Sequence, residues 1–196
     1  MNATKKLDVV AICGSLRRDS LNRKALRAAE ELMPPSMTMQ VVEIGDLPMY
    51  NFDLHQVGFP APVIRLYERI KAADAVLIAT PEHNGSMPAA LKNVIDWMSR
   101  FKPPPFVNMP CAVLSASPGP LGGGRVQYDL RRSMSFVQAL IMLQPEVFIA
   151  YSPTKFDENG RFTDEVGRQI LAQQMTAFDE WIRRIKSAFP VPADAN

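Results

Sequence analysis

Residues 7–13, LDVVAIC, run directly into the polar stretch GSLRRDSLN at residues 14–22, and this junction decides the fold. The first stretch is rich in Val and Ile and stops at Gly14, which is typical of a strand buried on both faces of a parallel sheet. Beyond the polar stretch, residues 23–33 place apolar side chains on one face of a helix that ends at two prolines. The junction therefore predicts a strand, a loop and a helix.

The same alternation continues to the end of the chain, with an irregular connection at residues 45–62 and Pro88 at the first position of its helix. Five strands alternating with helices favour an α/β, flavodoxin-like three-layer sandwich whose parallel sheet has the order 2-1-3-4-5. Strands 1, 3 and 4 are then neighbours. The later strands are expected at residues 37–44, 75–80, 111–117 and 145–151, and the later helices at 63–73, 89–101, 125–140 and 164–188.

Length and composition describe an ordinary globular protein, and we expect residues 1–196 to form one domain. The net charge is only +2 and its basic residues are scattered among acidic ones, which argues against nucleic acid as a partner. No apolar run approaches the roughly 20 residues that span a bilayer, so we expect no membrane association and a cytoplasmic location. Cys13 and Cys111 lie in predicted core strands and are expected to be buried and reduced, and no metal-binding motif is present.

The loop at residues 14–22 has the composition of an anion site. It leads into a helix and so offers free backbone N–H groups at the positive end of a helix dipole. Ser15, Ser20 and Asn22 add hydrogen-bonding side chains, and the guanidinium of Arg17 can hold two phosphate oxygens at once. A well-capped helix with exposed arginines is the alternative. The glycine patterns of dinucleotide-binding turns and P-loops are absent, so a single phosphate fits this loop better.

The loop at residues 80–88, TPEHNGSMP, predicts a rigid turn with a polar rim. Its backbone groups can meet the edge of a heterocycle while Pro81 and His83 offer flat surfaces against it. A tight turn with a solvated His83 is the alternative. Glu82 can either contact a ligand or orient the loop.

The loop at residues 115–125, SASPGPLGGGR, holds four of the ten glycines of the chain. Glycine allows a backbone to approach a planar ligand closely and to adopt positive φ, whereas the alternative reading is simple flexibility. Ligands of doubly wound sheets bind at the carboxyl ends of the strands, so the three loops are expected to meet in one crevice.

Together the three loops resemble the NADPH-dependent FMN reductase family, which includes bacterial chromate and quinone reductases and related azoreductases. The resemblance covers about residues 8–186, and PEHNGSMPAALKNVIDW at residues 81–97 is its most specific part. The family usually has Tyr at the position of His83, so ring stacking, flavin potential and acceptor preference are expected to differ here. The family also forms homodimers and homotetramers, and the interface candidates that the resemblance implies are Arg125, Tyr128 and Glu146.

The resemblance implies FMN as cofactor and NADPH or NADH as co-substrate. The first loop would hold the FMN phosphate, the second would line the isoalloxazine ring, and the third would close the site. The residues placed there by the resemblance are Ser15, Leu16, Arg17, Ser20, Asn22, Pro81, Glu82, His83, Asn84, Gly85, Ser117 and Gly122.

The expected function is an NAD(P)H-dependent FMN or quinone reductase that serves quinones, free flavin, chromate or similar small-molecule acceptors by a ping-pong mechanism. The flavin carries the chemistry, so no protein nucleophile or general base is expected. A flavodoxin-type electron carrier is the alternative, although a pI near 8.6 is unlike the acidic surface of such carriers. A phospho-receiver would need acids at the strand ends, where this chain has Gly14 and Thr80.

Overall fold

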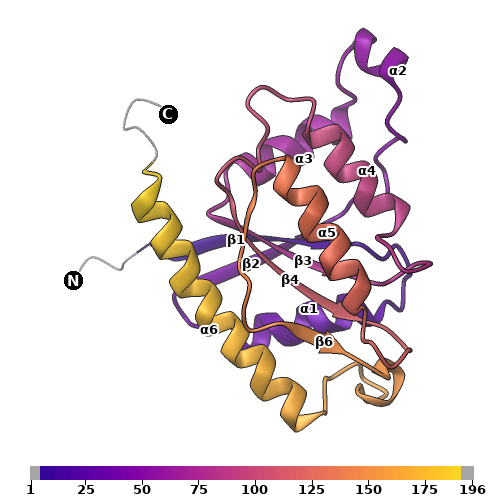
Figure 1. Ribbon diagram of the computed structural model, residues 1–196, viewed down its shortest axis with the longest axis vertical. Helices are drawn as coiled ribbons and strands as arrows, with labels where there is room; N and C mark the ends of the chain where they lie inside the picture. Colours follow the sequence, from indigo (N-terminus) through magenta and orange to yellow (C-terminus); the bar gives the residue numbers. More distant parts are fainter. Residues whose placement is uncertain (1–4, 191–196) are drawn as a thin grey trace.

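A computed structural model describes residues 5–190, and a parallel β-sheet forms its centre (Figure 1). The strands lie in the order β2-β1-β3-β4-β5, and β6 also pairs with β4. This order confirms the predicted flavodoxin-like α/β fold, with a sixth strand attached. The strands are β1 (Leu7–Cys13), β2 (Met37–Val42), β3 (Ala75–Thr80), β4 (Pro110–Ala116), β5 (Leu140–Ile141) and β6 (Val147–Ile149).

Helices cover both faces of the sheet, because parallel strands need crossover connections. Figure 1 shows α1 and α6 on one face and α3, α4 and α5 on the other. Strand residues alternate between the two faces, so that Val9 and Ala11 pack under the first group while Val10 and Ile12 pack under the second. The helices are α1 (Leu21–Leu32), α2 (Phe52–Val57), α3 (Ala61–Lys71), α4 (Ala89–Met98), α5 (Gly124–Phe136) and α6 (Glu165–Ala188), with a 3-10 helix at Ser152–Thr154.

The edge of the sheet beside β4 differs from the prediction. The strand expected at residues 145–151 is only three residues long, and a second short strand, β5, pairs with the beginning of β4. The helix expected over residues 125–140 ends at Phe136, so its last predicted turn is replaced by a connection into β5. Pro88 is the N-cap of α4, one position earlier than predicted.

Residues 45–62, which were predicted to be irregular, contain the short helix α2. Asn51 caps this helix, because its side-chain oxygen accepts a hydrogen bond from the backbone N–H of Asp53 at 2.8 Å. The segment is fastened to α4 where Trp97 Nε1 donates to the carbonyl oxygen of Pro48 at 2.7 Å. None of the α2 residues is buried, so no hydrophobic periodicity marked this helix in the sequence.

Both cysteines are free and buried, as predicted. Burial raises the pKa of the Cys111 thiol, because the thiolate would lose its hydration inside the core. Within residues 5–190 we find no helix that combines the length and apolar character needed to cross a bilayer.

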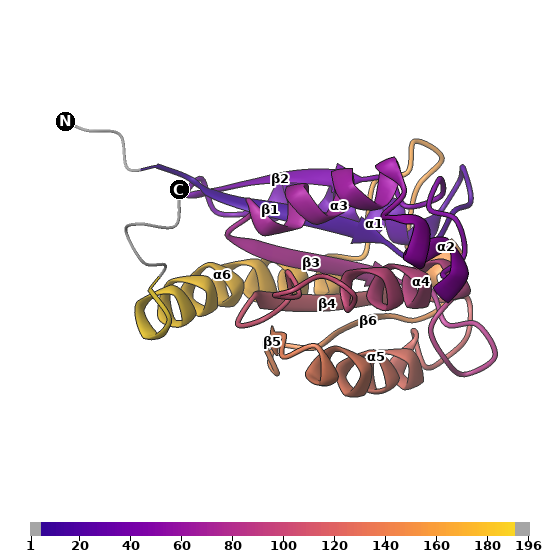
Figure 2. The same ribbon diagram turned by 90° about the horizontal axis from the view of Figure 1, so that it is seen from above.

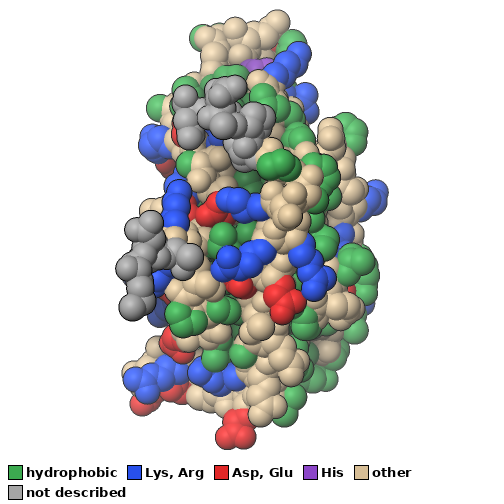
Figure 3. All heavy atoms as spheres, turned by 90° about the vertical axis from the view of Figure 1, so that its left-hand side faces the viewer, with side chains coloured by type: hydrophobic (Ala, Val, Ile, Leu, Met, Phe, Trp, Pro, Cys, Tyr) green, Lys and Arg blue, Asp and Glu red, His purple; other side chains and the backbone are tan. Residues whose placement is uncertain are grey.

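The side of the molecule where the strands begin carries mixed charge. Figure 3 looks onto this side and shows Lys and Arg side chains interspersed with Asp and Glu. Arg69 pairs with Asp8 at 2.7 Å near the start of β1, and Lys186 of α6 pairs with Asp74 just before β3. The acids at the amino ends of these two strands are therefore paired.

A buried amide ties α1 to the carboxyl end of β4. Asn22 Nδ2 donates to the carbonyl oxygen of Ala116 and its Oδ1 accepts from the Ala116 N–H, both at 2.9 Å. Because both backbone groups of Ala116 are buried, their partners must come from the protein. Asn22 supplies both of them across 94 residues of sequence.

We predict that Asn22→Ala lowers the free energy of unfolding by about 3 kcal/mol, because two buried backbone groups lose their hydrogen bonds. Urea denaturation monitored by circular dichroism measures the change. Asn159→Ala, at an exposed turn, is the control and should change stability by less than about 0.5 kcal/mol. Equal stability of the two variants would contradict the role given to Asn22.

Candidate functional site

The sheet brings the three polar loops to one edge. Cys13 of β1 lies opposite Ala79 of β3, and Thr80 of β3 lies opposite Ser115 of β4. The three strands therefore end at nearly the same level, and their loops leave the sheet side by side on the right of Figure 2. This is the edge at which doubly wound sheets bind ligands.

The first loop presents a run of unused donors. Within residues 5–190, no protein acceptor is found for the backbone N–H groups of residues 15–22. Ser20 caps α1 by accepting from the Arg23 N–H at 3.3 Å. The Ser15 side chain is buried at the base of the loop, and Arg17 is exposed without an ion pair among the described residues. Unused N–H groups, a hydroxyl and a guanidinium form a donor set that fits a phosphomonoester dianion.

The acidic residue of this loop does not oppose an anion. Lys24 Nζ lies 2.6 Å from Asp19 Oδ1, and this hydrogen bond lowers the pKa of the Asp19 carboxyl below its ordinary value. The negative charge of Asp19 is thus paired within the loop. Leu16 is exposed and lies next to Gly45, in the segment that follows β2.

Asn22 differs from the other members of the first loop. Its side-chain amide is committed to the backbone of Ala116, so it joins the first loop to the start of the third. Sequence alone gave no sign of this connection, and contact between Asn22 and a phosphate stays a prediction.

The second loop is built around a tight two-residue turn. His83 and Ser86 exchange backbone hydrogen bonds of 3.0 Å, and between them Asn84 and Gly85 have φ of 52° and 76°. Two central residues with positive φ define the type I′ geometry for which Asn-Gly is preferred. His83 and Asn84 are exposed at the rim and Pro81 is half-buried. The structure has the tight turn that both interpretations of this loop share, and contact between His83 and a ligand stays a prediction.

Glu82 orients this loop by capping a distant helix. Its carboxylate accepts hydrogen bonds from the N–H groups of Arg125 and Val126 at 3.1 and 3.3 Å, and Arg125 Nη1 lies 3.2 Å from it. The N-cap residue of α5, Gly123, has no side chain to supply these acceptors. Of the two roles open to Glu82, orientation of the loop has direct geometric support.

The glycines of the third loop serve backbone packing. Gly122 has φ of 57°, and a Cβ at this position would lie 2.8 Å from the backbone nitrogen of Ala150. The loop is therefore pressed against the end of β6 and is not simply flexible. Ser117 binds within the loop, where its hydroxyl accepts from the Gly119 N–H at 3.3 Å.

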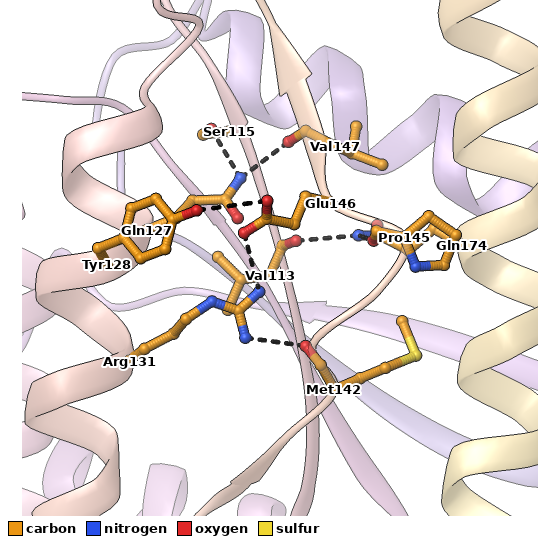
Figure 4. A network of polar contacts seen from close by, with 10 residues as sticks. All are labelled: Val113, Ser115, Gln127, Tyr128, Arg131, Met142, Pro145, Glu146, Val147 and Gln174. Atoms are coloured by element: carbon orange, nitrogen blue, oxygen red, sulfur yellow. Dashed lines mark hydrogen bonds and ion pairs between the residues drawn. The ribbon is translucent and has the colours of Figure 1, made fainter.

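A buried amide that the sequence analysis missed supports the third loop from below. Gln127 Nε2 donates to Ser115 Oγ and to the carbonyl oxygen of Val147, both at 2.8 Å (Figure 4). Ser115 Oγ in turn donates to the carbonyl oxygen of Gly122 at 2.7 Å. The available signal was a polar residue on the inward face of a helix, next to Val126.

The three interface candidates do not form one cluster. The Tyr128 hydroxyl donates to Glu146 at 3.5 Å, and Arg131 approaches the same carboxylate at 3.9 Å (Figure 4). Arg125 points instead to Glu82. Tyr128 is 61% exposed, so its ring is available to a partner.

The groups at this edge of the sheet are hydrogen-bond donors and tight turns, which bind and orient a ligand but do not react with it. In the part of the chain that the structure describes, no group of three or more His, Cys, Asp or Glu side chains is placed to hold a metal ion. The acids in and beside the loops, Asp19, Glu82 and Asp129, all accept hydrogen bonds from neighbouring groups. The arrangement suits the binding of a phosphorylated, flat ligand that brings its own reactivity.

Comparisons with known proteins point to one group of relatives. A model of the NADPH-dependent FMN reductase family matches residues 7–154. An NAD(P)H-dependent FMN reductase of Pseudomonas aeruginosa is 43% identical over 180 residues, which cover 92% of this chain and 97% of that protein. A quinone reductase of Escherichia coli is 40% identical over 186 residues, covering 93% and 99%. The structure of FerB, a flavoenzyme NAD(P)H:(acceptor) oxidoreductase from Paracoccus denitrificans, aligns with a TM-score of 0.84 at 36% identity and covers 91% of this chain and 98% of FerB.

We predict that Gly122→Ala destabilises the protein by about 2 to 4 kcal/mol, because it combines strain at positive φ with overlap against the β6 backbone. Gly124→Ala is the matched control, since a Cβ there meets nothing within 4 Å and its φ is not positive. Thermal unfolding of the two variants measures the difference. If Gly122→Ala were as stable as Gly124→Ala, the close packing of the third loop would be refuted.

Proposed function

The chain belongs to the NADPH-dependent FMN reductase family, and we propose that it reduces quinones, free flavin, chromate or similar small acceptors. It is an oxidoreductase whose cofactor is FMN and whose co-substrate is NAD(P)H. The range of acceptors is proposed from relatives that include FMN and quinone reductases. Family membership also favours the enzyme over a flavodoxin-type electron carrier.

One observation carries the placement of the cofactor. The unused N–H groups of residues 15–22 lie at the edge where β1, β3 and β4 end together. A phosphate is the ligand that this donor set favours, and the helix dipole of α1 adds to its attraction. We assign the phosphate to the first loop, with the side chains of Ser15, Arg17 and Ser20 beside it.

The flat part of the cofactor is assigned to the two remaining loops. The turn at residues 83–85 presents its rim to the same edge, and Pro81 offers a half-buried apolar surface. Ser117 and the chain at Gly122 bound the site from the third loop. Glu82 acts on the site indirectly, because its carboxylate is committed to the start of α5.

When bound, FMN supplies the redox chemistry by taking a hydride from the nicotinamide and passing electrons to the acceptor. The chain supplies binding and orientation: the first loop holds the phosphate charge, and the rigid second turn fixes the ring edge. We propose that NAD(P)H and the acceptor use the same exposed face in succession, which is a ping-pong mechanism.

Several finer features belong to the same proposal. We propose residues 1–196 as one FMN-binding domain, supported by two cores that share one sheet. Self-association as a homodimer or homotetramer is supported by the exposed apolar side chains of Leu121, Tyr128 and Phe148, which line a hollow of about 510 Å³. A cytoplasmic location is supported by two buried, free cysteines.

We predict that the FMN-loaded protein loses its visible flavin absorbance when NADPH is added without oxygen, and regains it when a quinone follows. Anaerobic absorbance spectroscopy measures both steps, with free FMN and NADPH as the control. A bound flavin that neither NADPH nor NADH bleaches would contradict a reductase. A protein that binds no FMN would contradict the assigned site.

The order of the two half-reactions has its own test. Steady-state rates measured with NADPH and quinone varied together should give parallel double-reciprocal lines. Intersecting lines would show that both substrates bind before any product leaves, and would contradict the ping-pong mechanism.

A further inference from the structure

Two carboxylates fasten the second loop to helix α5. Glu82 accepts from the first N–H groups of α5, at Arg125 and Val126, and Ser86 donates its hydroxyl to Asp129 on the next turn of the same helix. Glu82 and Ser86 are four residues apart in the loop, and Arg125 and Asp129 are four residues apart on the helix. The turn at residues 83–85 is therefore held at both ends, by Glu82 and by Ser86, at two places on α5 that lie one helical turn apart.

Asp129 is well suited to hold such a point. Besides Ser86, its carboxylate accepts from Arg132 at 2.8 Å, and its side chain is only 19% exposed. Hydrogen bonds from Ser86 and Arg132 lower the pKa of the Asp129 carboxyl, so it stays ionised at neutral pH. One ionised group on α5 thus holds the loop through the Ser86 hydroxyl.

The fixed points set where the turn lies. Asn-Gly is preferred in a type I′ turn, so Asn84 and Gly85 keep the shape of the turn, but the hydrogen bonds between His83 and Ser86 do not fix its position against α5. If one end were released, the loop would spread over several conformations. A ligand would then bind only the fraction in the right one, and its affinity would fall by that fraction.

We propose that Asp129 is a positioning residue for the flavin site, which holds the second loop in its binding conformation through Ser86. The inference rests on the proposed function, because it takes this loop as the one that meets the isoalloxazine. Asp129 acts through the loop and has no contact of its own with the cofactor.

The chain contains a matched control for this residue. Asp179 on α6 also accepts from a serine hydroxyl, that of Ser36 at 3.1 Å, and from an arginine on the next turn, Arg183. Its side chain is 18% exposed. Ser36 immediately precedes β2, at the opposite end of the sheet from the three loops. The two aspartates therefore share their chemistry and differ in location.

The test is FMN affinity, measured by fluorescence titration of the apoprotein, for Asp129→Asn, Ser86→Ala and the double variant. Ser86→Ala removes the donor of the Ser86–Asp129 hydrogen bond and Asp129→Asn removes the charge of its acceptor, and we expect each to weaken FMN binding roughly ten-fold. Because both act through the same contact, the double variant should bind FMN about as well as either single variant. The midpoint potential of the bound FMN, measured by dye-coupled titration, should shift in the same variants.

Asp179→Asn and Ser36→Ala should leave both FMN affinity and midpoint potential unchanged. Urea unfolding of the apoproteins compares the stability of the two pairs, and Ser86→Ala decides the matter if Asp129→Asn does not fold. If the wild-type protein binds FMN and either Asp129→Asn or Ser86→Ala has unchanged FMN affinity, the role given to Asp129 is overturned and the proposed function still stands. Equal weakening by the Asp179 and Asp129 substitutions would also overturn it. Wild-type protein that binds no FMN would overturn the proposed function as well.

Discussion

The parallel register of β1, β3 and β4 is the constraint on which the rest of the structure depends. Pairing Cys13 with Ala79 and Thr80 with Ser115 brings three strand ends to one level, so loops far apart in sequence leave the sheet together. Parallel pairing also requires the crossover helices, and these bury both faces of the sheet in two apolar cores. A shift of one residue in any of these pairings would turn core side chains to the wrong face.

At this edge the acidic side chains hold the loops in place, and the backbone N–H groups are left to bind a ligand. Asp19, Glu82 and Asp129 are each committed to a lysine, a helix end or a serine. The N–H groups of residues 15–22 remain available, and they favour an anion without adding a titrating group. Such a site fits a cofactor that carries its own reactivity, which agrees with membership of the FMN reductase family. The work of the protein is then to hold and orient.

Local patterns were enough to predict most of the fold. The bounds of β1 and β3 match the prediction because both are continuous apolar runs ended by polar loops. Helix α2 was missed because it buries nothing, and the division of the last strand was missed because β5 and β6 are each too short to show a period. For the site, the three loops were found from composition. Contacts that span the chain, such as Asn22 with Ala116, Glu82 with α5 and Ser86 with Asp129, left no local signal.

The most direct test of the central claim, that the three loops form one FMN site at the carboxyl edge of the sheet, is hydrogen–deuterium exchange with and without FMN. The account predicts that FMN slows exchange in residues 14–22, 81–88 and 115–124 together, while the edge where the strands begin is unchanged. Protection confined to one loop, or centred on the opposite edge of the sheet, would contradict it.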